Sequence, residues 1–286
     1  MDQTQQYFAP ASLNQALERL TGGEVSILAG GTDLMPQAQA GKLRLKRTLM
    51  NIRRVPELIG VARQGGDICI GALTTITELM DNALVQQHLP VLVDACNHFA
   101  SDQIRNAATL GGNICNASPA GDTLIPLLVL DARVELASKR RGKLHWRSLP
   151  LAEFFTGPGR TRRAPDELLV GVRIPLPDKG RVAYFHKFGT RPALDISTIS
   201  IGIAGTLKHG TLSNVRVAFG AVAPTPVRAP LTERALEGKR LDADSIAQVA
   251  EVARNEVKPI DDVRATAWYR KEMIHNITRR MLSHVA

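Results

Sequence analysis

The stretch Leu28-Ala29-Gly30-Gly31-Thr32-Asp33-Leu34 decides the fold of this chain. It follows the short apolar run 25–29, which is typical of a buried strand, and it leads into a helical stretch that begins at Leu34. Two consecutive glycines at the end of a strand let backbone N–H groups turn toward one point, because no Cβ atom blocks them. An amphipathic helix at 12–20 and a further strand at 47–52 complete a β-α-β-like unit. We expect its glycine turn to accommodate an anionic group such as pyrophosphate.

A second glycine pair, Gly111-Gly112, lies in the segment 101–122, which is rich in Gly, Asn, Ser and Thr although apolar segments flank it. A buried polar loop needs hydrogen-bond partners, and a phosphorylated ligand would supply them. Asp122, at its end, is expected to accept from a ribose or from a loop amide. The alternative is an Ω-loop stabilised by its own Asn and Ser side chains. Two such loops in one domain favour a dinucleotide held from both sides, although neither has the G-x-G-x-x-G or Walker spacing, which disfavours a Rossmann domain.

The remaining patterns predict an α+β chain in two parts, 1–177 and 178–286, with the boundary in the Pro- and Gly-containing cluster 175–180. The first part divides again into about 1–56 and 57–177. It is expected to contain strands at 67–71, 133–137, 144–147 and 168–174, helices at 75–82 and 91–100, and a buried apolar segment at 124–130. The smaller second part is expected to be a three-stranded antiparallel sheet (183–188, 198–207, 215–222) followed by helices at 231–239, 243–257 and 263–285.

Composition excludes several classes of protein. The 286 residues are 44% apolar and 22% charged, which is ordinary for a globular protein and excludes disorder and fibrous repeats. No apolar stretch approaches the roughly 18 residues of a membrane helix, and the first residues lack the basic-then-apolar order of a signal peptide. We therefore expect a cytoplasmic protein without membrane insertion. The net charge of +9 comes partly from clusters at 42–54, 139–143 and 160–163, which would attract phosphates or acidic partners.

No pattern predicts catalytic side chains or a metal site on this chain. The seven histidines form no H-x-x-x-H pair, and a G-x-S-x-G sequence is absent. The three cysteines, Cys69, Cys96 and Cys115, lie far apart without C-x-x-C spacing, so we expect reduced, mostly buried thiols. Redox chemistry on this chain would have to come from a cofactor.

Several short segments, taken in their order along the chain, resemble the FAD-binding subunits of molybdenum hydroxylases. This family includes xanthine dehydrogenases and the medium subunits of carbon monoxide, quinoline and nicotinate dehydrogenases. The resemblance covers almost the whole chain and rests on 29–34 (AGGTDL), 109–114 (TLGGNI), 70–72 (IGA) with Thr74-Thr75, 103–106 (QIRN), 157–159 (GPG), 166–169 (DELL), 185–188 (FHKF) and 195–197 (DIS).

The resemblance implies a two-part FAD-binding domain of the vanillyl-oxidase (PCMH) type, with non-covalent FAD, followed by the smaller α+β domain. The two glycine pairs would hold the pyrophosphate, and Asp122 would bind on the adenosine or ribityl side. Lys187 would approach the polar edge of the flavin, where a cation favours the anionic reduced form. Ile196 stands where carbon monoxide dehydrogenases carry a tyrosine and xanthine dehydrogenases an isoleucine. The implied FAD-binding residues are Leu28, Ala29, Gly30, Gly31, Thr32, Asp33, Leu34, Thr109, Gly111, Gly112, Asn113, Ser118, Asp122, Leu168, Leu169, Lys187 and Ile196.

The resemblance also implies an oxidoreductase subunit that works with partners. A large subunit would carry the molybdenum cofactor and a small subunit would carry 2Fe–2S clusters. This chain would take electrons at FAD and pass them to NAD⁺ or another acceptor, most like the xanthine or purine dehydrogenase branch. It lacks the four-cysteine insertion of some relatives, so flavin is the one redox centre expected here. Two alternatives remain: a stand-alone FAD-dependent oxidase, and a basic nucleic-acid-binding module, which the low aromatic content disfavours.

Overall fold

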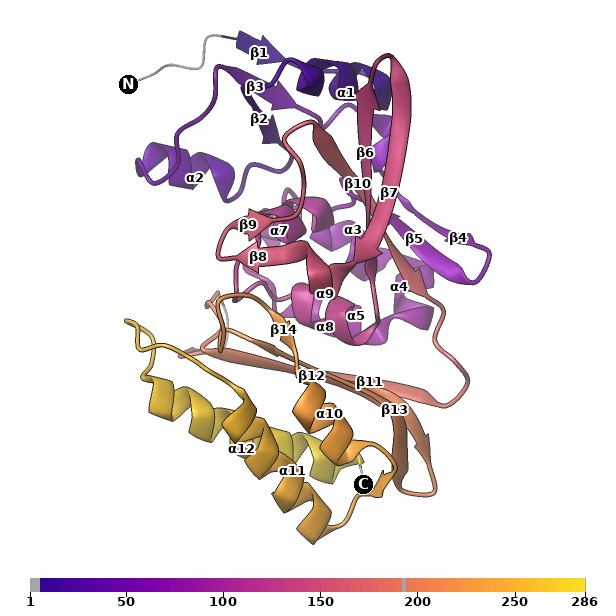
Figure 1. Cartoon of the computed structure of the whole chain (residues 1–286), viewed down its shortest axis with the longest axis vertical. Helices are drawn as coiled ribbons and strands as arrows, with labels where there is room; N and C mark the ends of the chain where they lie inside the picture. Colours follow the sequence, from indigo (N-terminus) through magenta and orange to yellow (C-terminus); the bar gives the residue numbers. More distant parts are fainter. Residues whose placement is uncertain (1–5, 192–193, 286) are drawn as a thin grey trace.

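The computed structural model describes residues 6–191 and 194–285, and its three larger sheets lie one above the other in Figure 1. The first is parallel, with the order β1-β3-β2. Its strands are β1 (Gln6–Phe8), β2 (Val25–Leu28) and β3 (Thr48–Asn51), accompanied by α1 (Leu13–Thr21) and α2 (Leu34–Gln39). The predicted β-α-β unit is confirmed, because α2 joins the parallel strands β2 and β3. Helix α1 begins where its sequence predicts, since the Ser12 hydroxyl accepts from the Gln15 amide.

The second sheet is antiparallel and has the order β4-β5-β10-β6-β7. Its strands are β4 (Val61–Gln64), β5 (Asp67–Gly71), β10 (Glu167–Pro175), β6 (Arg133–Arg140) and β7 (Lys143–Pro150). The shorter elements around it are η1 (Pro56–Leu58), α3 (Ile76–Asp81), α4 (Ala83–His88), α5 (Pro90–Asn97), α6 (Asp102–Arg105), α7 (Leu110–Asn116), α8 (Leu124–Val129), α9 (Leu151–Phe154), β8 (Phe155–Gly157) and β9 (Arg160–Thr161). All four predicted strands of this part are present, and β6 and β7 extend further because they pair up to the tight turn at Arg141-Gly142.

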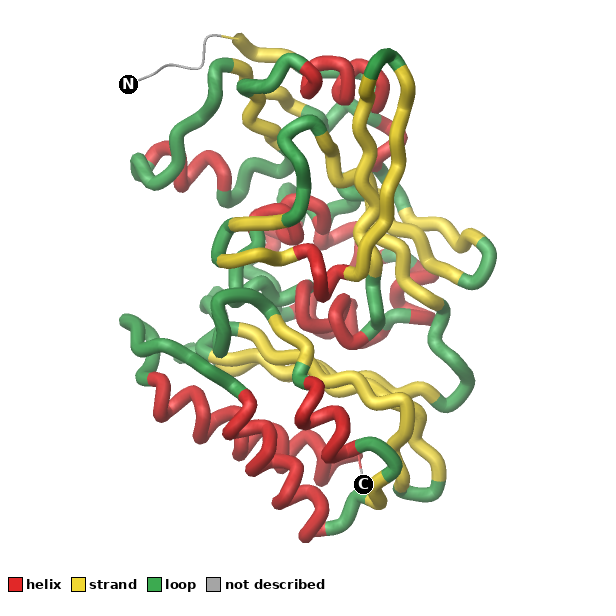
Figure 2. The backbone as a smooth tube through the Cα atoms, viewed as in Figure 1, coloured by secondary structure: helices red, strands yellow, loops and turns green. Residues whose placement is uncertain are grey.

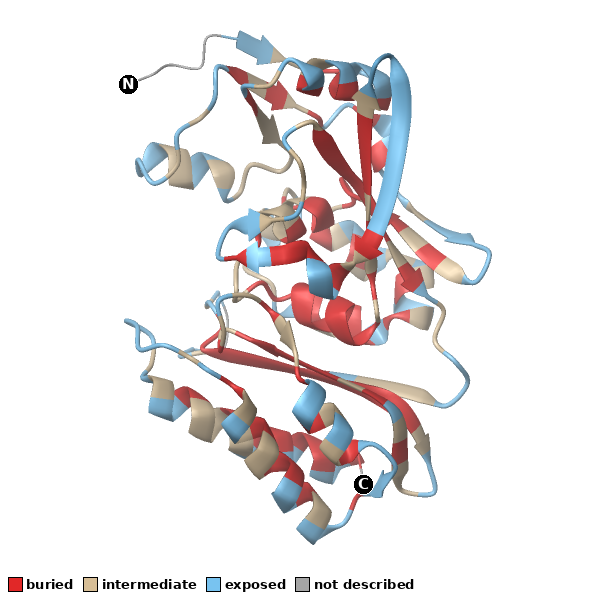
Figure 3. Ribbon diagram, in the orientation of Figure 1, coloured by how far each residue is buried: buried red, intermediate tan, exposed pale blue. Residues whose placement is uncertain are grey.

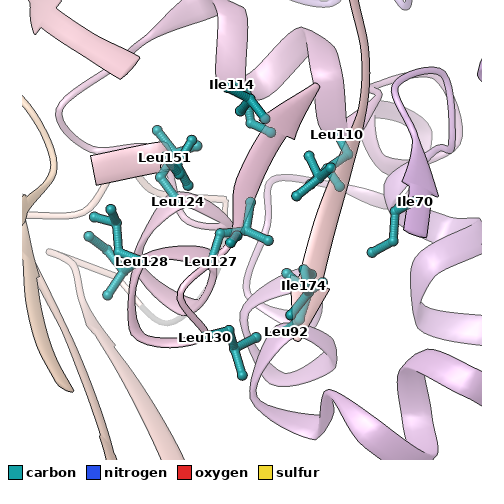
Figure 4. Close-up of a cluster of buried hydrophobic side chains, with 14 of the residues drawn as sticks. Ile70, Leu92, Leu110, Ile114, Leu124, Leu127, Leu128, Leu130, Leu151 and Ile174 are labelled. Carbon is teal, nitrogen blue, oxygen red and sulfur yellow. The ribbon is translucent and has the colours of Figure 1, made fainter. Parts of the chain in front are cut away.

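Helix α8 lies at the centre of the largest hydrophobic core. All six of its residues are buried, as the apolar run at 124–130 predicts. Figure 4 shows Leu124, Leu127 and Leu128 among side chains from other elements, including Leu110 and Ile174. Figure 3 shows the same helix as one of the most completely buried elements. This core fixes the segments on either side of α8, which carry several of the predicted cofactor-binding residues.

The third sheet and its helices form the C-terminal part. The antiparallel sheet runs β11 (Arg181–Phe188), β12 (Ile199–Lys208), β13 (Thr211–Gly220) and β14 (Val227–Arg228), with β15 (Lys239–Arg240) also paired to β13. Helices α10 (Pro230–Leu236), α11 (Ala243–Glu256) and α12 (Ala267–Val285) pack on one side of it, as Figure 2 shows. The prediction of three strands was incomplete, because the two-residue strands β14 and β15 are too short to leave an alternating pattern.

The start of α12 also differs from the prediction, which placed it at residue 263. The Asp262 carboxylate accepts hydrogen bonds from the amides of Arg264 and Ala265, which forms a turn in place of the first helical residues. The helix therefore begins at Ala267.

The C-terminal sheet docks onto α8 through two glycines. A Cβ atom at Gly202 of β12 would lie 2.8 Å from Ile125 Cγ2, and one at Gly220 of β13 would lie 3.1 Å from Ile125 Cδ1. Both positions therefore need glycine so that the helix can approach the sheet closely. The C-terminus of α8 is held by arginines from the sheet: Arg216 and Arg228 both bind the Asp131 carboxylate, at 2.8 Å.

Candidate functional site

The two glycine-rich segments predicted to act together do lie against each other. A Cβ atom at Gly30 would lie 2.0 Å from the carbonyl oxygen of Ala107 and 3.1 Å from the Cα atom of Ala108. The end of β2 therefore packs backbone to backbone on the chain that leads into α7. No side chain fits between these segments, which explains the glycine at position 30.

The turn after β2 has backbone amides without protein partners. Gly31 has φ +77°, a left-handed conformation that favours glycine, and its carbonyl accepts from the Met35 amide. Within residues 6–191 and 194–285, no hydrogen bond is donated by the amides of residues 30–33. Gly30, Gly31 and Thr32 are half-buried and Asp33 is exposed. Half-buried amides normally have partners, so consecutive ones without an acceptor suit an anionic ligand such as pyrophosphate. Asp33, at the start of α2, accepts from the Gln37 side chain.

The second glycine pair is not in a loop, which corrects the sequence prediction. Gly111 and Gly112 form the first turn of α7, which the Thr109 hydroxyl caps by accepting from the Gly112 amide at 3.1 Å. The Gly111 amide donates to the Ala72 carbonyl at 2.9 Å, and a Cβ atom at Gly111 would lie 2.7 Å from that oxygen. This glycine therefore serves close packing of α7 on the end of β5. The Ω-loop alternative is also wrong for residues 110–116.

Polar side chains of the following segment stabilise each other. The Thr123 hydroxyl donates to Asn113 Oδ1 at 2.7 Å, which ties α7 to the start of α8. The Ser118 hydroxyl accepts from the Ala120 amide at 3.2 Å, and the Ala221 amide of the C-terminal part donates to the Pro119 carbonyl at 2.8 Å. Residues 113–123 thus lie in a hydrogen-bonded connection between the two parts of the chain.

Asp122 and Lys187 form a buried ion pair between the two parts. Lys187 Nζ, on β11, lies 2.7 Å from Asp122 Oδ2, and the two side chains are 8% and 10% exposed. Lys187 Nζ also donates to the His98 carbonyl at 2.9 Å, and the Ser197 hydroxyl donates to Asp122 Oδ1 at 2.8 Å. Burial raises the pKa of the Asp122 carboxyl, and the Lys187 ammonium opposes that rise. Neither His98 nor Ser197 was identified as a contact from the sequence, although Ser197 directly follows the predicted residue Ile196.

The remaining predicted residues fall into three environments. Leu168 and Leu169, on β10, are 2% and 3% exposed and face two different hydrophobic cores. Ile196 is 52% exposed on the loop between β11 and β12. In Figure 1 this loop, helix α2 and the β8–β9 hairpin lie along the same side of the molecule. Leu28, Ala29, Thr32 and Leu34 surround the glycine turn and are half-buried.

The described residues contain no cluster of three or more His, Cys, Asp or Glu side chains that could hold a metal ion. All three cysteines are free thiols; Cys96 is buried, whereas Cys69 and Cys115 are only half-buried. Among the helices of residues 6–191 and 194–285, none is long and apolar enough to cross a membrane.

Comparison with known protein families identifies the class of protein to which this chain belongs. The family model described as the FAD-binding domain in molybdopterin dehydrogenase matches residues 3–177, and the carbon monoxide dehydrogenase flavoprotein C-terminal domain matches residues 183–285. The chain is therefore a flavoprotein subunit of a dehydrogenase, with an FAD-binding domain followed by a C-terminal α+β domain.

Individual relatives match over nearly their whole length. The chain is 35% identical to the xanthine dehydrogenase FAD-binding subunit of Escherichia coli O157:H7 over 97% of this chain and 94% of the relative. It is 30% identical to the carbon monoxide dehydrogenase medium chain of Hydrogenophaga pseudoflava over 97% and 96%. A solved structure of the Hydrogenophaga enzyme superposes with a TM-score of 0.91 at 29% identity, covering 98% of this chain and 96% of the other. The chain belongs to the family of FAD-binding subunits of molybdenum hydroxylases.

Proposed function

We propose that this chain is the electron-transfer subunit of a xanthine or purine dehydrogenase-like complex. It would take electrons from 2Fe–2S clusters on a small partner subunit and pass them from FAD to NAD⁺ or another acceptor. A large partner subunit would hold the molybdenum cofactor and oxidise the substrate. The observation that carries the FAD assignment is the turn at residues 30–33, where four backbone amides have no acceptor in the described chain while Gly30 packs on the Ala107 backbone.

The structure offers a specific set of residues for the pyrophosphate end of FAD. In this proposal the amides of Gly30, Gly31, Thr32 and Asp33 donate to the pyrophosphate oxygens, since they lack other partners. Leu28, Ala29 and Leu34 would border the pyrophosphate, and the Asn113 and Ser118 side chains would face it from the other segment. Gly111 and Gly112 contribute by close packing, because the first amides of α7 already have acceptors.

The flavin end is assigned to the junction of the two parts. Lys187 would place its charge at the polar edge of the flavin ring while Asp122 and the His98 carbonyl hold the ammonium in position. The Asp122 carboxylate would then orient Lys187 and Ser197 in addition to any contact on the ribityl side. Ile196 is exposed and would pack on the ring. The side chains of Leu168 and Leu169 are buried in two different cores, so these residues would border FAD through their backbone. When bound, FAD supplies one- and two-electron redox chemistry, so no side chain of this chain has to act as an acid or base.

Assembly and location belong to the same proposal. The exposed basic turn of the β6–β7 hairpin, residues 140–143, would dock with partner subunits. The free thiols agree with a reducing compartment such as the cytoplasm. Arg140 is already paired with Asp166 at 2.9 Å, so Arg141→Glu at the hairpin turn is the cleaner charge reversal for testing subunit assembly. We place the domain boundary between residues 177 and 178, in the connection from β10 to β11.

The experiment that tests the FAD assignment is cofactor release from the purified chain. Heat should release FAD in a 1:1 ratio from the yellow protein, and Gly30→Val should abolish the colour because its side chain would collide with the Ala107 carbonyl. Gly66→Ala is the matched control, since a Cβ atom there meets nothing within 4 Å. If the chain is colourless even when co-expressed with its partner subunits, the proposal is wrong. Steady turnover of a simple organic substrate by the isolated chain would instead support the stand-alone oxidase, and salt-dependent binding to random duplex DNA by a flavin-free chain would support the nucleic-acid module.

A further inference from the structure

Strand β7 forms a free edge of the five-stranded sheet. It pairs with β6 along its whole length, and within the part of the chain that the structure describes no strand pairs with its other edge. The first six of its eight residues are exposed, and Figure 3 shows most of the strand in pale blue. An uncovered edge of this length presents a row of backbone N–H and C=O groups with which a further strand can pair.

The two faces of β7 carry different side chains. Its basic side chains share one face and its apolar ones, Leu144 and Trp146, share the other, because successive side chains of a strand point to opposite faces. Leu144 and Trp146 are 47% and 58% exposed. The residues opposite them on β6 are covered by α1: Ala137 is buried in the core beside this helix, and Lys139 pairs with Glu18 at 3.2 Å. Helix α1 therefore covers β6 on this face and leaves the apolar strip of β7 open.

The hairpin around this edge is strongly basic. Residues 139–147 contain five Lys and Arg residues and no Asp or Glu. Three of these charges are already paired with carboxylates of neighbouring elements, those of Lys139, Arg140 and Arg147. Among the described residues, no carboxylate forms an ion pair with Arg141 or Lys143. The charge left over at the start of β7 favours an acidic partner.

Other occupants match this edge less well. Pairing β7 of two copies of this chain would bring two basic hairpins together, and like charges on neighbouring strands are destabilising. Nucleic acid would match the charge but lacks the backbone amides that pair with a strand edge. The opposite edge strand of the sheet, β4, has four residues, and none of them is an exposed large apolar residue. The combination of a long free edge, an apolar strip and unpaired positive charge thus distinguishes β7.

We propose that the free edge of β7 receives an extended acidic segment of a partner protein as a sixth strand. Backbone hydrogen bonds hold the segment, and its side chains alternate as those of β7 do. Its apolar residues cover Leu144 and Trp146, and its acidic residues lie on the other face beside Lys143 and His145. As a statement about subunit assembly this inference rests on the proposed function, and it adds which kind of partner segment the hairpin binds.

The test uses the full chain and its two tryptophans, Trp146 and Trp268, as separate reporters. Trp268→Phe leaves Trp146 as the one indole, and Trp146→Phe leaves Trp268, which is exposed in the C-terminal part. The probe is a capped peptide of alternating glutamate and valine with the length of β7. Two control peptides have the same length: one carries lysine in place of glutamate, and the other has methylated backbone nitrogens and cannot pair as a strand.

Binding of the acidic peptide should shift the fluorescence emission of Trp146 to shorter wavelength, because the indole leaves water, and should not change the emission of Trp268. Lys143→Gln should weaken binding about twofold to fivefold, which is the effect of losing one exposed charge pair. The matched control is Lys258→Gln, which removes the same charge from an exposed position of the C-terminal part and should leave the affinity unchanged.

The inference is overturned if the acidic peptide leaves the Trp146 emission unchanged at millimolar concentration. It is also overturned if the lysine peptide or the methylated peptide produces the same shift, since binding would then require neither opposite charge nor backbone pairing. An equal shift at Trp268 overturns it as well. A chain that binds the acidic peptide but carries no FAD contradicts the FAD assignment alone, and a yellow chain that does not bind the peptide contradicts this inference alone.

Discussion

Replacing Lys187 with methionine removes the cation that faces the buried Asp122 carboxylate. In the native chain these groups lie 2.7 Å apart, are about nine-tenths buried, and belong to different parts of the molecule. Breaking a buried ion pair on one side costs about 3–5 kcal/mol, because the remaining charge is left without a partner in a low-dielectric site. We expect Lys187→Met to lower the free energy of unfolding by that amount.

A second variant separates the lost pair from lost packing. Asp122→Asn combined with Lys187→Met removes both charges while keeping similar volumes, and the asparagine can still accept from the Ser197 hydroxyl. The double variant should therefore recover most of the stability lost in Lys187→Met, to within about 1 kcal/mol of the native chain. Lys208→Met, at an exposed position on β12 of the same sheet, is the control for removing a lysine charge and should cost less than about 0.5 kcal/mol.

Urea unfolding followed by circular dichroism measures these differences, and its pH dependence gives an independent check. Burial already raises the pKa of Asp122, and loss of the ammonium should raise it further. A carboxyl whose pKa is raised on folding destabilises the folded state as pH rises above its unfolded value and through its folded value. The deficit of Lys187→Met should therefore narrow at acidic pH. A loss below about 1 kcal/mol, or a double variant whose cost is the sum of the two single ones, would refute the reasoning.

Three further predictions concern Gly202, Asp262 and Cys96. Gly202→Val should lower stability by about 1–3 kcal/mol, measured by urea unfolding, because its Cβ would lie 2.8 Å from Ile125 Cγ2 where α8 meets the C-terminal sheet. The hydrogen bond from buried Arg270 holds the pKa of Asp262 well below its usual range, so this carboxylate contributes stability above about pH 4 that is lost on acidification. Asp262→Asn should accordingly flatten the acid side of the stability–pH curve, and an unchanged slope would contradict this. Burial raises the pKa of Cys96 to about 12, so this thiol should react with Ellman's reagent at about pH 8 only after unfolding.

Elements with a clear local pattern could be predicted from the sequence. The apolar spacing in 13–20 and the Ser12 cap placed α1 to within one residue at each end. Strands β5, β6, β7 and β10 to β13 were found because alternating or continuous apolar runs end at prolines and glycines, whereas the short strands β8 and β9 were not predicted. These features depend on neighbours within a few residues, which a single sequence contains.

Helix α7 could not be predicted, because its stability is not local. Two glycines and two asparagines among seven residues are poor helix formers, and their composition indicates a loop. The helix forms because Thr109 caps it and because the Gly111 amide finds the Ala72 carbonyl, 39 positions earlier in the chain. The Asp122–Lys187 pair is similarly non-local, because its members lie 65 positions apart in the sequence. From the sequence we predicted separate FAD-binding roles for Asp122 and Lys187, but we did not predict that the two side chains contact each other.

The glycines that allow close packing form two groups, one at the proposed cofactor site and one where the two parts of the chain dock. Because one segment of chain contacts both groups, we expect cofactor binding and docking to depend on each other. Gly111, Gly202 and Gly220 allow backbone or helix to approach protein atoms, whereas Gly30 and Gly31 also border amides that lack protein acceptors. The chain from α7 to α8 connects both groups: it begins at the segment packed on Gly30, carries Asp122 to Lys187, and ends in the helix seated on the glycines of the C-terminal sheet. A ligand that binds at the 30–33 turn and reaches Lys187 would contact both parts only in their docked arrangement. By linkage it would stabilise that arrangement, and loosening the α8 contact would weaken its binding.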